Sequence, residues 1–214
     1  MQNQELRSSR REYTKGELLE NEVPANPMDL FSDWWKEWES LGRPDTTAMT
    51  VSTTGADGIP DARIVLLKGI ENGAFTFFTN YKSKKGSDIE ANPMVHILFF
   101  WAEQERQVRV VGHATKLSFE KNQSYFKERP VGSQIGAISS PQSSVIVNRE
   151  VLESEVEANN AKYGELGPDC PEHWGGYAVE PFQIEFWQGR ASRLHDRLRY
   201  KKSHSSWSVE RLAP

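Results

Sequence analysis

Residues 48–79 read AMTVSTTGADGIPDARIVLLKGIENGAFTFFT, and this stretch decides the fold. Its β-branched and aromatic residues predict three strands, at 48–54, 60–68 and 74–79. The intervening Gly55-Ala56-Asp57-Gly58 and Glu71-Asn72-Gly73 contain the residue types that tight turns prefer. Successive strands joined by such short turns form antiparallel hairpins. We therefore expect an antiparallel sheet to begin at Ala48.

The rest of the chain adds further strands with helices between them. Strands are predicted at 94–101 and 107–117, and two or three more between Tyr177 and Leu212. Helices are predicted from Asn26 to Gly42, from Ser118 to Arg129, and at 84–91, 131–138 and 149–163. Strands and helices do not alternate one-to-one, which disfavours a doubly wound parallel sheet. About seven hairpin-linked strands favour a mainly β fold of the α+β class, an antiparallel barrel with helices packed outside.

Composition limits the classes of function. The chain has 214 residues, a formal net charge of −4 and one cysteine, Cys170. This gives no overall signal for nucleic-acid binding and excludes an intrachain disulfide or a multi-cysteine metal site. No apolar run approaches the ~18–20 residues that cross a membrane, and Met1–Lys15 lacks a secretory signal, so we expect a cytoplasmic protein. We expect a flexible segment at 1–25, which lacks hydrophobic periodicity, followed by a single domain at 26–214.

Near the C-terminus, the sequence Arg193-Leu194-His195-Asp196-Arg197 places three potential cations at alternate positions. If this segment is a strand, those three side chains share one face. They repel one another unless an anion lies across them, which suits binding of a phosphorylated or anionic ring compound. A solvated basic edge strand, which resists aggregation, has the same pattern.

Two further segments have the chemistry of phosphate sites. Residues 80–86 place three lysines at the start of a predicted helix, where they oppose the helix dipole unless an anion compensates. A basic surface loop is the alternative. Tyr125, Arg129 and Ser133 lie four residues apart, and Pro130 can end one helix and begin the next. A phenol, a guanidinium, a hydroxyl and free helix N–H groups would then converge.

Individual side chains between these segments carry weaker signals. Arg63 and Lys68 are five residues apart, so a straight strand points them to opposite faces. We expect them to serve different anionic groups unless the strand bends or ends between them; a buried strand with solvated ends is the alternative. Gln107 and Gln142 can each donate and accept hydrogen bonds, which suits the edge of a flavin or pyridine ring.

Other chemistries find no support in the sequence. There is no His-Glu-x-x-His or His-x-x-x-His pattern for a metal, so we expect none. Phosphate-cradling Gly-x-Gly-x-x-Gly and the Gly-x-Ser-x-Gly nucleophile turn are also absent.

An ordered set of short motifs, from about residue 7 to the end, resembles the pyridoxamine/pyridoxine 5′-phosphate oxidase family. The motifs are Arg-Arg-Glu-Tyr (10–13), Arg-Ile-Val-Leu-Leu-Lys (63–68), Phe-Thr-Asn (78–80), Ser-Lys-Lys (83–85), Glu-Arg-Gln-Val (105–108), Tyr-Phe (125–126), Arg-Pro (129–130), Ser-Gln-Ile-Gly-Ala (133–137), Gln-Ser-Ser (142–144), Trp-Gly-Gly (174–176), Glu-Phe-Trp-Gln-Gly (185–189), Arg-Leu-His-Asp-Arg (193–197) and Arg-Leu-Ala-Pro (211–214).

The resemblance implies a flavin-binding split barrel that works as a homodimer with FMN at the subunit interface. It implies FMN-binding roles for Arg63, Val65, Leu66, Lys68, Phe78, Thr79, Lys84, Lys85, Gln107, Gln142, Ser143, Trp187 and Arg197. It implies a substrate site made by Arg10, Arg11, Glu12, Tyr13, Lys68, Tyr125, Arg129, Ser133, Arg193, Leu194 and His195, with residues 10–13 closing over it. Phe78 and Lys84 stand where this family commonly has Tyr and Arg.

The activity implied is FMN-dependent oxidation of pyridoxamine and pyridoxine 5′-phosphate to pyridoxal 5′-phosphate. Dioxygen would be the acceptor, giving hydrogen peroxide, and the amine would also release ammonia. Arg193 and His195 are the implied catalytic residues: Arg193 would hold the ring against the flavin, and His195 would make a polar contact or handle a proton. Two alternatives remain open, another split-barrel flavoprotein such as a flavin reductase and a non-catalytic protein that binds FMN or pyridoxal phosphate.

Overall fold

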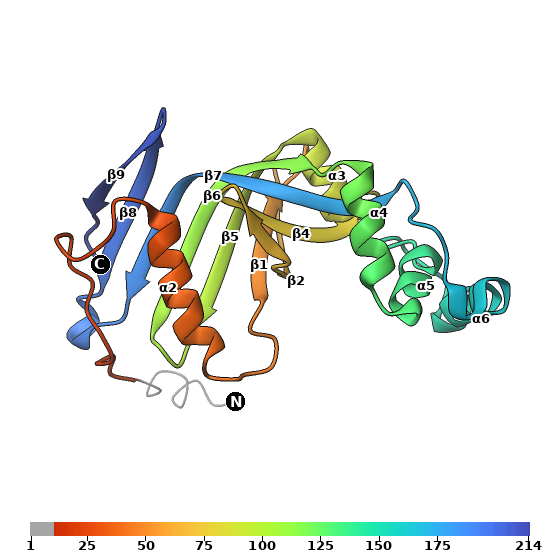
Figure 1. Ribbon diagram of the computed structural model, residues 1–214, viewed down its shortest axis with the longest axis horizontal. Coiled ribbons are helices and arrows are strands. Elements are labelled where there is room, and N and C mark those ends of the chain that lie inside the picture. Colours follow the sequence, from red (N-terminus) through yellow and green to blue (C-terminus); the bar gives the residue numbers. More distant parts are fainter. Residues whose placement is uncertain (1–10) are drawn as a thin grey trace. The chain divides into compact units, whose positions relative to one another are not determined.

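The computed structural model describes residues 11–214 (Figure 1). Its strands are β1 (Ala48–Thr54), β2 (Pro60–Leu66), β3 (Gly69–Glu71), β4 (Ala74–Asn80), β5 (Met94–Trp101), β6 (Arg106–Lys116), β7 (Trp174–Gln188), β8 (Asp196–Ser203) and β9 (Ser206–Arg211). Its helices are α2 (Pro27–Glu39), α3 (Lys84–Ala91), α4 (Phe119–Glu128), α5 (Val131–Ser139), α6 (Arg149–Tyr163) and the short 3-10 turns η1 (Gly164–Leu166) and η2 (Ala191–Arg193). Arg10 lies outside the described residues, so its role stays a prediction.

Helix starts follow the local capping chemistry. The Asn26 side chain accepts a hydrogen bond from the backbone N–H of Met28, and Pro27 opens α2 as predicted. In the same way, Ser118 accepts from the backbone N–H of Lys121 at the start of α4. The predicted strands at 48–54 and 94–101 are confirmed, but the three-residue strand β3 was not predicted because it is too short to show an alternating pattern.

The predicted strand through Arg193, His195 and Arg197 is wrong. β8 begins only at Asp196, and residues 191–193 form the turn η2. Ser192 and Arg193 have left-handed φ values of 56° and 61°. The chain must reverse direction between the antiparallel strands β7 and β8, so these residues form the connection and their side chains do not share one strand face.

The sheet is the predicted mainly antiparallel one. Its hydrogen-bonded strand order is β2-β1-β5-β6-β7-β4-β3, with β8 paired to β7 and β9 paired to β8. The pairings β3–β4, β4–β7, β7–β8 and β8–β9 are antiparallel. The 15-residue strand β7 pairs with β4 through 174–179 and with β8 through 183–188. The mainly β fold with helices that the sequence predicted is therefore confirmed.

Two compact units make up the described chain. Within residues 11–214, unit 1 contains 11–49, 97–111 and 181–214, and unit 2 contains 50–96 and 112–180. The longer strands β5, β6 and β7 contribute residues to both units.

The core of unit 1 is aromatic. Phe31 and Trp34 lie on the buried face of α2. Phe31 packs edge-on against Phe99 of β5 with ring centroids 5.1 Å apart, and Trp34 packs edge-on against Phe186 of β7 at 5.2 Å. Edge-to-face pairs at these distances add to the free energy gained by burying the rings. The aromatic face of α2 that carries Phe31 and Trp34 is therefore part of this core.

Unit 2 is held by a buried polar cluster as well as by apolar packing. Asn122 of α4 is 3% exposed, and its side chain accepts from the backbone N–H of Gly176 at 2.9 Å and donates to the Tyr81 hydroxyl at 3.1 Å. Tyr81 in turn donates to the Gly176 carbonyl at 3.0 Å. These bonds connect α4 to β7, which places the end of α4 beside the cavity described below.

The start of α3 depends on a close backbone approach at Gly86. A Cβ atom at this position would lie 2.1 Å from the Tyr81 carbonyl oxygen, which is backbone and cannot rotate away. We expect Gly86→Ala to lower the free energy of unfolding by about 3 kcal/mol, as other overpacked sites do. Gly132→Ala is the matched control, because a Cβ there meets nothing within 4 Å, and its effect should stay within about 1 kcal/mol of the parent. Urea unfolding followed by circular dichroism measures both, and equal stability of the two variants would contradict this interpretation.

Candidate functional site

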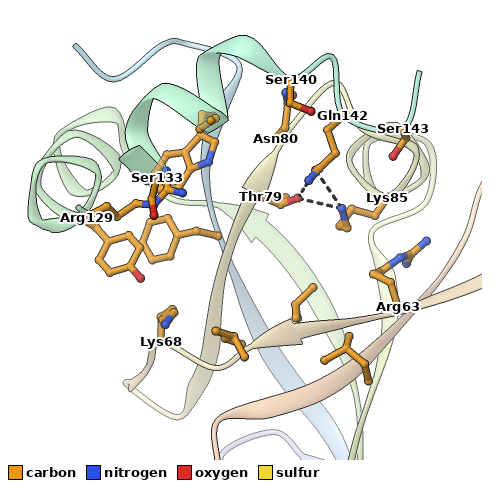
Figure 2. A pocket seen from close by; sticks show the side chains of 18 of the residues that line it. Arg63, Lys68, Thr79, Asn80, Lys85, Arg129, Ser133, Ser140, Gln142 and Ser143 are labelled. Atoms are coloured by element: carbon orange, nitrogen blue, oxygen red, sulfur yellow. Dashed lines mark hydrogen bonds between the residues drawn. The ribbon is translucent and has the colours of Figure 1, made fainter. Parts of the chain in front are cut away.

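A cavity of about 920 Å³ in unit 2 collects most of the predicted site residues (Figure 2). Twelve of them line it: Arg63, Val65, Leu66, Lys68, Phe78, Thr79, Lys85, Tyr125, Arg129, Ser133, Gln142 and Ser143. The volume is in the range of sites that hold a cofactor-sized molecule. Four of the lining residues are cations, and none of the lining residues within the described chain is an Asp or Glu. The cavity therefore suits an anionic ligand.

Arg63 and Lys68 reach the same cavity because strand β2 ends between them. β2 stops at Leu66, so the alternation of a straight strand does not extend to Lys68. The Arg63 guanidinium is held by the Val51 carbonyl at 3.1 Å, the Thr53 hydroxyl at 2.9 Å and the Asp61 carboxylate at 2.5 Å. These bonds hold both Nη atoms of the guanidinium. Lys68, in contrast, is exposed.

Lys85 is a buried cation, with 8% of its surface exposed. Its Nζ donates to the hydroxyl of Thr79 at 3.1 Å, the Gln142 Oε1 at 3.2 Å and, more weakly, the Ser83 hydroxyl at 3.4 Å. These acceptors are neutral, and Figure 2 shows Lys85, Thr79 and Gln142 joined in one cluster. Burial, together with the nearby Arg63, lowers the pKa of the Lys85 ammonium. A ligand anion at this position would favour the charged form.

Arg129 and Ser133 flank another part of the cavity, in the arrangement that the sequence predicted. Arg129 is the C-cap of α4, Pro130 is the N-cap of α5, and Ser133 lies in the first turn of α5. Pro130 supplies no side-chain cap, and its carbonyl accepts from the backbone N–H groups of Ser133 at 2.8 Å and Gln134 at 3.1 Å, which leaves the first N–H groups of α5 for an anion. Among residues 11–214, the buried Nη1 of Arg129 has no hydrogen-bond partner, and burial lowers the pKa of this guanidinium. An unpaired buried N–H is costly, which marks a place for a ligand acceptor.

Stacked aromatic rings support this end of the cavity. The rings of Phe78 and Tyr125 lie 4.0 Å apart and nearly parallel, and Phe78 also stacks on Trp174 at 5.4 Å. The Arg129 guanidinium lies 4.6 Å from the Trp174 ring centroid. Trp174, Asn80 and Ser140 line the cavity although the sequence analysis gave them no role. Trp174 and Asn80 belong to the quoted motifs Trp-Gly-Gly and Phe-Thr-Asn, and this membership was the sequence signal that could have indicated a role for them.

Lys84 lies outside the lining of this cavity. Its Nζ pairs with Asp88 one turn along α3, at 2.6 Å, and the Asp88 hydrogen bond raises the pKa of Lys84. Asp88 also accepts from the Thr53 hydroxyl at 2.8 Å. The charge of Lys84 at the start of α3 is thus balanced by a carboxylate within the described chain.

The other predicted site residues belong to unit 1, where Tyr13, Trp187 and His195 form an aromatic cluster. The Tyr13 ring packs edge-on against Trp187 at 5.7 Å and against His195 at 5.6 Å, and Trp187 and His195 lie 4.6 Å apart. His195 Nδ1 accepts a hydrogen bond from the backbone N–H of Arg190 at 3.1 Å. A neutral His195 ring therefore carries its proton on Nε2, which is then a donor.

The remaining unit 1 residues differ in how they are held. Arg197 pairs opposite Trp187 in the β7–β8 ladder, and its Nε donates to Glu185 at 2.8 Å. Arg193 and Leu194 are exposed on the connection before β8, and Gln107 is half-buried near the start of β6. Arg11 and Glu12 are exposed beside Tyr13.

Among residues 11–214, no group of three or more His, Cys, Asp or Glu side chains is placed to hold a metal ion. No helix in that part of the chain is long and apolar enough to span a membrane.

Known proteins resemble this chain over nearly its whole length. Residues 36–163 match the family model described as pyridoxamine 5′-phosphate oxidase, and residues 174–214 match the pyridoxine 5′-phosphate oxidase C-terminal dimerisation region. A Pseudomonas putida (strain W619) protein named pyridoxine/pyridoxamine 5′-phosphate oxidase is 47% identical over 213 residues, which cover 99% of each chain.

Solved structures share the fold. PhzG from Burkholderia lata, in complex with tetrahydrophenazine-1-carboxylic acid, superposes with a TM-score of 0.86 at 25% identity, covering 94% of this chain and 100% of that one. A pyridoxamine 5′-phosphate oxidase-related, FMN-binding protein from Nostoc punctiforme superposes with a TM-score of 0.68 at 16% identity, covering 90% and 100%.

The buried charge of Lys85 predicts a pH-dependent stability without bound ligand. The pKa of Lys85 in the folded chain is below the usual 10.5 of the unfolded chain. Between the folded and the unfolded pKa, the unfolded chain binds more protons, so the free energy of unfolding rises with pH in that range. Below the folded pKa, the full cost of burying the charge lowers the free energy of unfolding. We expect Lys85→Met to stabilise the ligand-free protein at pH 8, by about 1.4 kcal/mol for each unit of pKa depression, and this gain to vanish towards pH 10.5.

Urea unfolding between pH 7 and pH 10.5 measures this difference. Lys116→Met is the control, because Lys116 is exposed and paired with Glu90. A Lys85→Met effect that does not change with pH would contradict the assignment.

Proposed function

Because the chain belongs to the pyridoxamine 5′-phosphate oxidase family, we propose that it oxidises pyridoxamine and pyridoxine 5′-phosphate to pyridoxal 5′-phosphate. The observation that carries this proposal is the cavity of unit 2, where Arg63, Lys68, Lys85 and Arg129 face a space whose described lining holds no carboxylate. Four cations match a cofactor and a substrate that each carry a phosphate.

FMN is the cofactor, and the residues present fit it. The cluster of Lys85, Thr79 and Gln142, with Arg63 and Ser143 nearby in the lining, offers the charge and hydrogen-bond donors that a flavin phosphate and ring edge need. Val65 and Leu66 add apolar surface for the ring. When bound, FMN supplies the redox chemistry by taking up a hydride from the C4′ carbon of the substrate. Gln107, Trp187, Arg197 and Lys84 are further FMN contacts in this proposal.

The substrate phosphate is assigned to the other part of the cavity. Arg129 offers its unpaired Nη1, Ser133 a hydroxyl, and the start of α5 free N–H groups. Lys68 and the Tyr125 hydroxyl complete the set of donors. Phosphate contacts remote from C4′ supply the binding energy that aligns the reacting carbon.

The ring of the substrate is assigned to the unit 1 residues. Arg193 would hold the ring in place, Leu194 and residues 10–13 would border it, and His195 would face its polar substituents. Because His195 Nδ1 already accepts from the Arg190 N–H, the free Nε2–H of the neutral ring is a donor. We therefore propose that His195 donates a hydrogen bond to a substrate oxygen and does not remove a proton through Nε2.

The overall reaction needs an electron acceptor, and we propose dioxygen. Pyridoxine 5′-phosphate and dioxygen would give pyridoxal 5′-phosphate and hydrogen peroxide. Pyridoxamine 5′-phosphate would consume one water as well and release ammonia. The residues of the chain bind and orient the reactants in this proposal and are not themselves oxidised or reduced.

Other functions make different demands on the same residues. A flavin reductase, or a protein that only binds its ligand, does not need Tyr125, Arg129 and Ser133 around one cavity together with Lys68. PhzG shares the fold and was solved with a tetrahydrophenazine carboxylate, so oxidation of such a ring is the second candidate. A carboxylate ligand of that kind carries no phosphate, which makes the phosphate contacts the discriminating feature.

A homodimer fits the dimerisation region matched by residues 174–214. The cavity is lined by unit 2 alone, whereas Trp187, Arg193, His195 and Arg197 belong to unit 1. We propose that FMN lies at the subunit interface and that unit 1 of the partner subunit completes each cavity.

Replacing Arg129 tests the function and the phosphate site together. The parent should be yellow and should produce peroxide with both phosphorylated vitamers. We expect Arg129→Gln to raise the KM for pyridoxine 5′-phosphate about 10- to 100-fold, since it removes a charge-assisted hydrogen bond. Lys127→Gln is the matched control: Lys127 is on the same helix but is exposed and paired with Asp169, so its KM should stay near the parent value. A parent that consumes no oxygen with either vitamer, with FMN added, would refute the function.

A mixed dimer tests whether two subunits build each site. Arg129→Gln and Arg193→Ala subunits, co-expressed with different tags, should form a dimer in which one site combines intact Arg129 and intact Arg193. At low substrate concentration, that mixed dimer should recover about half of the parent turnover, although the homodimer of each variant has low activity. If both residues came from the same subunit, neither site of the mixed dimer would be intact and no activity would return.

A further inference from the structure

Glu105, a residue of unit 1 that the proposed function does not use, binds the N-terminal segment through a buried carboxylate. Its side chain is 2% exposed and lies in the turn between β5 and β6. Its Oε2 accepts from the backbone N–H groups of Thr14 at 2.8 Å and Lys15 at 3.0 Å, and its Oε1 pairs with Arg11 at 3.2 Å. Three donors around one carboxylate hold residues 11–15 in place.

The backbone of Glu105 is bound to the end of β7 as well. Its carbonyl accepts from the backbone N–H of Gly189 at 2.7 Å and from the Gln188 side chain at 3.3 Å. Tyr13 lies directly on Gly189: a Cβ atom there would be 2.8 Å from the Tyr13 Cβ. One residue therefore holds both the segment that carries Tyr13 and the surface on which Tyr13 rests.

The conformation of Glu105 is unusual for its residue type. Its φ is 56°, which lies in the left-handed region. This conformation is unfavourable for a residue that has a Cβ atom. Strain of this kind persists only where surrounding contacts impose it, and it points to a role for the residue. Here Glu105 closes the turn between β5 and β6, where its backbone N–H donates to the Ala102 carbonyl at 3.3 Å and its carbonyl accepts from Gly189.

A second carboxylate anchors the same segment beyond Tyr13. Asp196, which follows His195, accepts from the backbone N–H of Leu18 at 3.0 Å and from Arg190 and Arg211. Its pKa is lowered by these hydrogen bonds against the opposing effect of burial. The segment from Arg11 to Leu18 is thus held on both sides of the contact between Tyr13, Trp187 and His195.

We propose that Glu105 is a positioning residue that holds Tyr13 against Trp187 and His195 by binding the backbone of residues 14 and 15. The consequence for catalysis rests on the proposed function, in which Tyr13 and His195 border the substrate and Trp187 contacts FMN. Without the carboxylate, Tyr13 leaves the surface of Gly189, and the substrate loses one wall of its site. Since Glu105 touches no reacting atom, its loss weakens substrate binding more than the chemical step.

Limited trypsin digestion of the full-length FMN-loaded protein tests the positioning directly. Lys15 is a cleavage site next to the amide that Glu105 binds. We expect Glu105→Ala to raise the rate of cleavage after Lys15 about tenfold, and Glu105→Gln to raise it about threefold, because the amide oxygen still accepts from the backbone while the pair with Arg11 is lost. Glu103→Gln is the matched control, since Glu103 carries the same charge in the same turn but its carboxylate pairs with the exposed Arg43. Its cleavage rate should equal that of the parent.

Steady-state kinetics give the second readout. Glu105→Ala should raise the KM for pyridoxine 5′-phosphate about tenfold and change kcat less than about twofold, and Gly189→Ala, which displaces Tyr13 but keeps Glu105, should do the same. Cleavage and KM of Glu105→Ala that equal those of Glu103→Gln would overturn the proposal; if Glu105→Ala does not fold, Glu105→Gln decides by the same comparison. A parent without oxidase activity would refute the proposed function, while the digestion would still decide the role of Glu105.

Discussion

Two cations that no carboxylate neutralises within the described chain, Lys85 and Arg129, are the constraint on which unit 2 depends, whereas Arg63 is paired with Asp61. Lys85 is buried against neutral oxygens, and Arg129 has a buried N–H that meets no acceptor in the part of the chain that the structure describes. Burial lowers the pKa of both groups, so each side chain is less stable as a cation than it would be in water. Such an arrangement is stable only with help from the surrounding elements, and a bound anion would relieve it. The end of β2, the start of α3 and the α4–α5 junction all deliver cations to this one cavity.

In unit 1, by contrast, carboxylates are paired within the unit: Glu105 and Glu185 are buried and Asp196 is partly buried. Glu105, Glu185 and Asp196 each accept hydrogen bonds from cations or backbone amides within the unit. Each of these carboxylates already has hydrogen-bond partners within the unit. Their contacts therefore hold neighbouring segments in place and do not require a ligand. The result is an ordered surface around Trp187 and His195. A cavity lined by cations and an ordered aromatic surface are features that suit a flavin cofactor.

Local chemistry made several parts of the structure predictable. Asn26 and Ser118 begin helices because a side-chain oxygen near a free N–H needs no distant partner. The Arg129–Pro130 junction was predictable for the same reason, since proline restricts the residue before it and opens the next helix. The strand through Arg193 and Arg197 was predicted wrongly, because alternation alone cannot show that the chain must turn between β7 and β8. The ion pair of Lys84 with Asp88 was overlooked, although the spacing of four residues on a helix permitted it.

The sequence by itself determined the antiparallel class, most element boundaries, the family and the set of candidate residues, because these depend on periodicity, capping and short motifs that lie close together in the chain. Only the tertiary structure decided that Arg63 and Lys68 share one cavity, that Arg129 keeps an unpaired N–H, and that Glu105 holds the segment carrying Tyr13. Glu105 and Thr14 are 91 residues apart, and no local pattern marks their contact. Burial and hydrogen-bond partners depend on which distant segments the fold brings together, and that information exists only once the chain has packed.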